Sequence, residues 1–244
     1  MRRTRAGFFS FTGITDPAAH RAYNEWHMLD HMPEQFAIPG VALGQRWVHT
    51  PAAAAGAIAL PPFDSVHYLT LYLMTDPLDE TLEEFVALGR HLHDVGDRWF
   101  DARLARVTGP WSVHAMAAAP RVKVRAGVIP ARPHRAIEVR AGAQLDDAAD
   151  LTALCERDGV AGAWSFAPNE VHARRRRGAP DVAITIAWID GPIDGKTRDQ
   201  PIAREHDVFA TTFETITPWQ WGWFDPPPKT AERTSNLGPA SCTG

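Results

Sequence analysis

The sequence predicts an α+β fold of two βαββαβ repeats whose four-stranded sheets pack against each other within one chain. Three short segments recur in the same order in the two halves of the 244 residues, which indicates an internal duplication. Apolar residues recur on alternate strand positions, so both faces of each sheet need cover, and packing sheet on sheet provides it. The paired segments are 39–42 with 158–161, 66–79 with 182–194, and 108–111 with 216–219.

Each element of the first repeat follows from local signals. Asp16 and Pro17 combine a favoured N-cap residue with proline at the first helical position, so a helix begins there. It is expected to end near Met32, because Pro33 disfavours a helical residue before it. A second helix is expected to begin at Asp79. Apolar and aromatic alternation predicts strands at 7–14, 41–50, 66–75 and 107–117.

The second repeat is expected to follow the same order in a degenerate form. Strands are predicted at 134–141, 162–173, 182–189 and 216–225, with helices from Asp147 and over 201–213. On the last of these strands Trp219, Trp221 and Trp223 alternate, so they are expected to share one face and to pack in the core. We therefore divide the chain into repeat 1 (1–120), repeat 2 (121–225) and a C-terminal tail (226–244).

Composition and charge exclude several classes of protein. The formal charge is −4 and the pI about 6.2, so no nucleic-acid partner is expected, and the run Arg174–Arg177 is interpreted as a solvated loop. The apolar run 51–62 is too short to span a bilayer, so no membrane partner is expected. Two cysteines do not make a disulfide framework, which is compatible with a reducing compartment. A cytoplasmic protein is the expectation.

The first predicted helix carries the most unusual chemistry of the chain. At about 100° per residue, His20, His27 and His31 lie within about 40° of one another, with Asn24 beside them and Tyr23 at the margin. Neighbouring imidazoles suit general acid–base catalysis near neutral pH. The same spacing could hold a divalent metal, although no third ligand is evident. An ordinary half-buried polar stripe is the third alternative.

Further polar and aromatic residues of the first repeat are candidates for the same site. Arg46 and Trp47 are adjacent on one predicted strand, so their side chains point to opposite faces. The same holds for His67 and Tyr68 on the next strand, where Tyr72 shares a face with Tyr68. At most one residue of each adjacent pair can therefore face the helices.

One stretch of the first repeat resembles a known group of proteins. Tyr23-Asn24-Glu25-Trp26-His27, followed by 31–34 (HMPE) and 38–41 (IPGV), resembles the EthD-like branch of the dimeric α/β-barrel superfamily, and Arg46-Trp47 fits its arginine-containing strand. The resemblance implies two ferredoxin-like repeats that form an intrachain dimeric α/β-barrel, with a pocket between sheet and helices. Relatives in this superfamily act on aromatic or polyketide-like compounds without a cofactor, or bind haem.

The resemblance and the residues together predict an enzyme of the cyclase, isomerase, lyase or monooxygenase type. It would act on a small aromatic or polyketide-like substrate by histidine acid–base chemistry, with no cofactor and no metal. The alternatives are a non-catalytic protein that binds a hydrophobic metabolite and a barrel that binds haem or a metal; association into a homodimer is left open. His27 and His31 are the catalytic candidates. The substrate-binding candidates are His20, Tyr23, Asn24, Arg46, Trp47, His67, Tyr68 and Tyr72.

Overall fold

The structure, a computed structural model, describes residues 3–54, 56–95, 100, 103–168, 171–178, 181–191 and 203–226. Its centre is one antiparallel sheet in the order β2-β4-β1-β5-β7-β8-β6-β9, with the short β3 added beside β9. The strands are β1 (Thr4–Ile14), β2 (Val41–Val48), β3 (Ile58–Ala59), β4 (Tyr68–Thr75), β5 (Arg103–Ala118), β6 (Ala136–Gly142), β7 (Val160–Pro168), β8 (Ala183–Ile189) and β9 (Asp207–Thr215).

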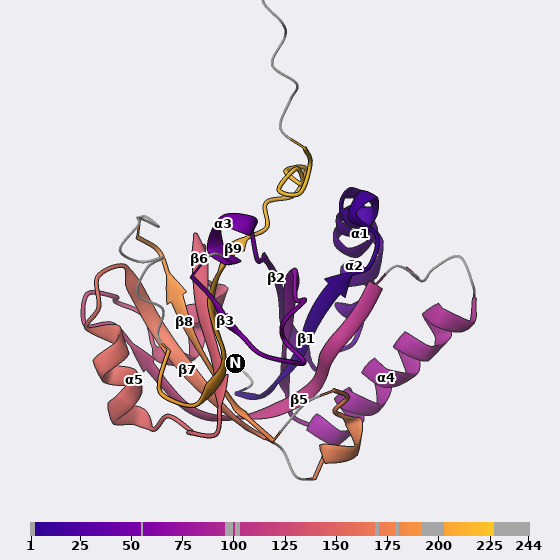
Figure 1. The fold of residues 1–244 in the computed structure, drawn as a ribbon. Coiled ribbons are helices and arrows are strands. Elements are labelled where there is room, and N and C mark those ends of the chain that lie inside the picture. Colours follow the sequence, from indigo (N-terminus) through magenta and orange to yellow (C-terminus); the bar gives the residue numbers. More distant parts are fainter. Residues whose placement is uncertain are drawn as a thin grey trace, which may run out of the picture.

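The first and last strands of this order also pair with each other, which closes the sheet. Trp47 on β2 lies opposite Thr215 on β9, and Val48 lies opposite Glu214. The result is a closed barrel of eight antiparallel strands (Figure 1). Closure removes the exposed sheet edges that would otherwise invite pairing with other chains.

This architecture corrects the predicted fold class. Two ferredoxin-like βαββαβ repeats forming an α/β-barrel are not what the chain builds, because the strands form one closed antiparallel barrel with few helices. The predicted helix over 201–213 is wrong: 207–215 is the barrel strand β9, while 201–202 lie outside the described residues. Alternating threonines and aromatic residues in β9 favour a strand, and the pairing with β2 and β6 fixes it.

The predicted last strand over 216–225 is also absent. This segment follows β9 as turns without regular structure, so its three tryptophans do not share a sheet face. Trp219 is 73% exposed, Trp221 is buried, and Trp223 is partly buried. The segment lies beside the first helix, where Trp221, Trp223 and Phe224 pack against aromatic residues of the first half.

The barrel interior holds the main hydrophobic core. On β4 the residues at odd positions, Leu69, Leu71 and Leu73, point inward and pack in one cluster with Phe9 and Trp164. The even positions of the same strand point outward, toward the helices. Because the interior is filled by side chains, a site that binds a small molecule has to lie outside the barrel wall.

Short helices cover two parts of the outer wall (Figure 1). The first helical stretch and α4 pack on strands of the first half. In the second half, α5 packs on β7 and on the neighbouring β5. Of the helices within the described residues, none has the length and apolar character to cross a membrane. The helical elements are 3-10 turns Pro17–Ala19, Ala126–Ala131 and Ala173–Arg175, α1 (His20–Trp26), a π-helix (His27–His31), α2 (Met32–Gln35), α3 (Pro51–Ala54), α4 (Leu78–Asp94) and α5 (Ala148–Cys155).

Candidate functional site

Three polar side chains of two neighbouring strands form a floor on the outer wall of the barrel. Arg46 on β2 pairs in register with Thr70 on β4, and Tyr68 lies two residues along on the same face. Their neighbours Trp47 and Leu69 point into the core. We call Arg46, Tyr68 and Thr70 the polar floor; each is at most 3% exposed.

The helical stretch above the floor supplies five polar and aromatic residues. Asp16 caps its start by accepting a hydrogen bond from the Ala18 amide at 2.9 Å. The α-helix gives way to a π-helix at 27–31, and helical structure continues past Pro33 to Gln35, three residues beyond the predicted end. We call His20, Tyr23, Asn24, His27 and His31 the histidine roof; all five are buried.

His27 and His31 lie edge to face at the end of the roof. Their ring centroids are 4.9 Å apart at an interplanar angle of 75°. Trp26 stacks on His31 at 4.6 Å, which fixes that ring. Nε2 of His27 is 3.5 Å from Oγ1 of Thr70 in the floor, a contact at the long limit of hydrogen bonding. Short π-helical stretches often occur at functional sites.

His20 belongs to a separate hydrogen-bond network at the other end of the roof. Its Nδ1 lies 2.8 Å from the Tyr68 hydroxyl, which also accepts a hydrogen bond from Nδ2 of Asn24 at 2.9 Å. Burial, and then the nearby His67, lower the pKa of His20 to about 4, so the ring is neutral at pH 7. The neutral ring accepts a hydrogen bond from the hydroxyl of Tyr68, whose pKa is raised chiefly by burial.

Of the remaining predicted residues, the structure brings some to the site and leaves others outside it. The ring centroids of His67 and His20 are 4.9 Å apart, and Nδ1 of His67 accepts a hydrogen bond from the Ile14 amide at 3.0 Å. Burial is the main cause of the lowered pKa of His67. Tyr72 faces outward but packs against Phe85 of α4, beyond the polar floor. Trp47 points into the barrel core, on the opposite face from Arg46.

The guanidinium of Arg46 lies against the rings of Tyr23 in the roof and Tyr68 in the floor. Its guanidinium carbon is 5.0 Å from the centroid of the Tyr23 ring and 5.4 Å from that of Tyr68. Burial lowers the pKa of Arg46, and the tyrosines raise it in part. The Tyr23 hydroxyl is one of the groups that raise the pKa of Arg46, although the contact falls short of a hydrogen bond of regular geometry. Tyr23 also contacts His27 at 5.6 Å between ring centroids, so it connects Arg46 to the histidine pair.

Two residues at the site are absent from the sequence-based set. Thr70 lies between Tyr68 and Tyr72 on the same face, so the alternation of β4 was a sufficient signal for it. Phe224 stacks on His20 at 3.9 Å between ring centroids and 14° between ring planes. No local pattern indicates this contact, because it joins residues 204 positions apart and belongs to the segment predicted as a strand.

The roof and the floor are in direct contact, through His27 with Thr70 and through Tyr23 with Arg46. A surface cleft beside Arg5 and Asp76, and another beside Leu29 and Pro33, include no residue of the roof or the floor. Within the described ranges, no three His, Cys, Asp or Glu side chains are grouped to hold a metal ion.

Fold and site define this chain as a closed antiparallel barrel with a buried polar site under one short helix. Among solved structures, it is similar to one titled "Crystal structure study of anthrone oxidase-like protein", with a TM-score of 0.54, 10% sequence identity, and coverage of 88% of this chain and 92% of that chain. At this identity the likeness concerns the fold alone. No family model and no curated protein matches the sequence.

Proposed function

We propose that the chain is an enzyme that transfers a proton to and from a small aromatic or polyketide-like substrate, using side chains and no organic cofactor. The observation that carries the proposal is the buried pair of His27 and His31 above Thr70. His27 Nε2 faces the floor in a long contact, so a substrate atom can replace Thr70 as its partner. His31, held by Trp26, orients the His27 ring.

The proposed step is the enolisation of a carbon acid. Nε2 of His27 accepts a proton from a carbon next to a carbonyl group, and the electron pair of the broken C–H bond moves to the carbonyl oxygen, which becomes an enolate. Return of the proton to carbon or oxygen completes an isomerisation. A proton-transfer group of this kind contributes roughly 10²- to 10⁴-fold to a rate.

The similarity of fold to a protein titled anthrone oxidase-like supports the choice of substrate class. An anthrone is a tricyclic aromatic ketone whose methylene protons are acidic because the resulting enolate is aromatic. The aromatic rings around the site, Tyr23, Trp26, Phe100 and Phe224 among them, suit a flat substrate of this kind.

Hydrogen–deuterium exchange at the methylene carbon of anthrone tests the proposal. Under nitrogen in D₂O, the wild-type protein is expected to accelerate exchange, and His27→Ala to lose roughly a hundredfold or more of this acceleration. His91→Ala is the matched control, because His91 is an exposed histidine of α4. Binding of anthrone without accelerated exchange would favour a non-catalytic binding protein, and equal exchange in His27→Ala and wild type would refute the role of His27.

A further inference from the structure

Arg46 is a buried cation with no carboxylate partner among the residues that the structure describes. Only 3% of it is exposed, and none of the residues in the described part of the chain accepts a hydrogen bond from its Nε, Nη1 or Nη2 atoms. None of the ion pairs among these residues includes it, although Arg140, which is equally buried, has carboxylate partners. A guanidinium carries five N–H donors, so Arg46 has donors to offer to a ligand.

Such a group costs free energy in the folded protein. Removing an ion from water is costly unless another charge and hydrogen bonds replace the hydration shell. The rings of Tyr23 and Tyr68 offset only part of this cost through cation–π contact. A buried and unsatisfied polar group in a native structure calls for an explanation, and the binding of a ligand provides one.

Two further buried polar atoms of the roof lack a hydrogen bond of regular geometry among the described residues. They are the hydroxyl of Tyr23 and Oδ1 of Asn24, both fully buried. The hydroxyl can donate to an anionic oxygen, and Oδ1 can accept from a hydroxyl group beside it. The surrounding rings are aromatic, and the single guanidinium matches one negative charge. These features suit an ionised aromatic oxygen better than a phosphate dianion.

We propose that Arg46 and Tyr23 bind an anionic oxygen of the ligand, a phenolate or an enolate, and that Asn24 accepts a hydrogen bond from a neighbouring hydroxyl group. This inference rests on the proposed function and deepens it, because the enolate formed by proton transfer to His27 would have its charge stabilised at Arg46. The ligand class is thus an aromatic compound with an acidic enol or phenol group.

The corresponding position of the second half has a serine in place of the arginine. Counted from the matching register shifts after Val41 and Val160, Arg46 and Thr70 on β2 and β4 correspond to Ser165 and Thr185 on β7 and β8. Both serine and threonine are buried, and their hydroxyls donate hydrogen bonds to Asp146. The fold therefore accepts a small, hydrogen-bonded side chain at this strand position, and the arginine of the first half serves something else.

4-Nitrophenol is a direct probe, because its phenolate is coloured and its methyl ether, 4-nitroanisole, has a similar size but cannot ionise. The wild-type protein is expected to bind 4-nitrophenol more tightly than 4-nitroanisole and to increase the phenolate absorbance at a pH near the phenol's pKa. Arg46→Met should lose roughly ten- to a hundredfold in affinity for the phenolate, the range for hydrogen bonds to charged groups. Arg46→Lys should retain part of the preference, since it keeps the charge but loses the guanidinium geometry.

Thermal unfolding shows whether a loss of binding in Arg46→Met comes from a loss of stability. Arg46→Met should unfold at the same or a higher temperature than the wild type, because it removes an unpaired buried charge, whereas a structural role predicts a lower temperature. Arg121→Met is the control for binding, since Arg121 is paired with Asp190 on another part of the surface.

Failure of this inference and failure of the proposed function give different results. If wild-type protein binds neither probe, or if Arg46→Met binds the phenolate as tightly as wild type, the anionic-oxygen site is wrong even when anthrone exchange depends on His27. If Arg46→Met loses phenolate binding while His27→Ala exchanges anthrone normally, the site stands and the role of His27 is wrong.

Discussion

The outer walls of the two halves have the same strand order but differ in how buried charge is paired. The order β2-β4-β1-β5 in the first half is matched by β7-β8-β6-β9 in the second. Where the first half has Arg46 beside Thr70, the second has Ser165 beside Thr185, and both of these hydroxyls donate hydrogen bonds to Asp146. The next pair on the same face of the second half, Ala163 and Ala187, packs with Leu151 of α5 in an apolar cluster.

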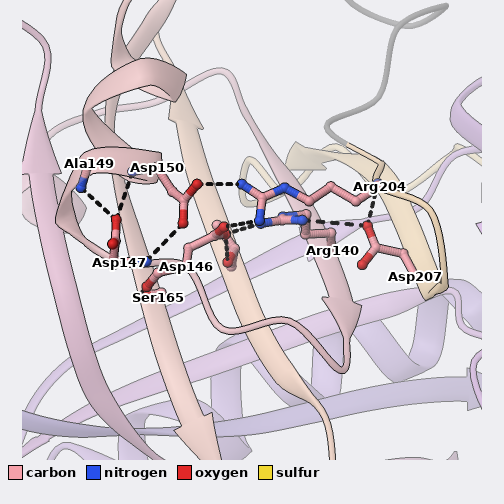
Figure 2. Close-up of polar contacts among 9 residues, drawn as sticks. Arg140, Asp146, Asp147, Ala149, Asp150, Ser165, Arg204 and Asp207 are labelled. Atoms are coloured by element: carbon pink, nitrogen blue, oxygen red, sulfur yellow. Dashed lines mark hydrogen bonds and ion pairs between the residues drawn. The ribbon is translucent and has the colours of Figure 1, made fainter.

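The second half also contains buried charges, but its charges are paired. Arg140 is 3% exposed and forms ion pairs with Asp146 and Asp207, and Arg204 bonds to Asp146 at 2.8 Å and to Asp150 at 2.9 Å (Figure 2). Buried arginine is thus paired with carboxylates in the second half, whereas in the first half Arg46 contacts the rings of two tyrosines. Paired charge belongs to the framework, whereas the unpaired charge of Arg46 marks the candidate site.

The largest effect is expected when an unpaired charge is placed in the apolar part of the second half's outer wall. Ala163→Arg would place a cation under α5, in the cluster that contains Leu151 and Ala187. We expect a loss of about 4 kcal/mol or more in the free energy of unfolding, from the uncompensated charge and from overpacking. Urea unfolding followed by tryptophan fluorescence measures it.

Ala153→Arg provides the matched control, because Ala153 is an exposed residue of α5, the helix that covers Ala163. Its effect should stay within about 0.5 kcal/mol. An Ala163→Arg protein as stable as this control would mean that the space under α5 accommodates a cation. A buried cation without a carboxylate partner would then not distinguish the first half from the second.

The paired arginine of the second half should give the next largest effect. Arg140→Met removes one of the two cations that pair with the fully buried Asp146; of the partners in the described residues, Arg204 and the Thr185 hydroxyl remain. We expect a loss of about 3 kcal/mol in the free energy of unfolding. Arg46→Met, a change of the same kind at an equally buried position, should cost nothing.

An exposed pair sets the scale for this measurement. Arg121, about half exposed, contacts Asp190, and its replacement by methionine should cost at most about 1 kcal/mol. Equal losses in Arg140→Met and Arg46→Met would show that both arginines are structural, and the inference about a ligand at Arg46 would then have no support from stability.

Local signals in the sequence were enough for several elements and for part of the site. Asp147 was predicted to begin a helix, and it caps α5 with a capping box to Asp150. The alternation on β4 separated Tyr68 and Tyr72 from their core-facing neighbours. His27 and His31 were expected together because their spacing alone brings them to one helix face, and the structure has them in contact.

Features that depend on distant pairing were not accessible in the same way. Barrel closure rests on Trp47 opposite Thr215, two positions far apart in the chain. Most of β9, residues 207–213, was predicted as part of a helix because the repeat pattern required one there. The stacking of Phe224 on His20 likewise depends on where the chain passes after β9. Trp47 was grouped with Arg46 by sequence proximity, although a strand sends adjacent side chains to opposite faces.

A dependence of stability on pH is expected from His20, which belongs to the buried network of the first half. The pKa of His20 is about 4 in the folded protein against 6.5 as the ordinary value, because burial and His67 outweigh the opposing charges of Asp16 and Asp225. The unfolded chain therefore binds a proton that the folded protein does not accept between these two values. Stability is present above about pH 6.5 and is lost as the pH falls toward 4.

Measured by urea unfolding, wild-type protein should lose about 1–3 kcal/mol more than His20→Gln across this window, because glutamine keeps a polar partner for Tyr68 but does not titrate. Subtracting the two curves removes the contributions of His49, His67 and His134, whose pKa values are also lowered mainly by burial. Parallel curves would mean that His20 is protonated as easily in the folded protein as in the unfolded chain. The stack with Phe224 would then be open to solvent, and the buried network that distinguishes the first half from the second would not hold at this end of the roof.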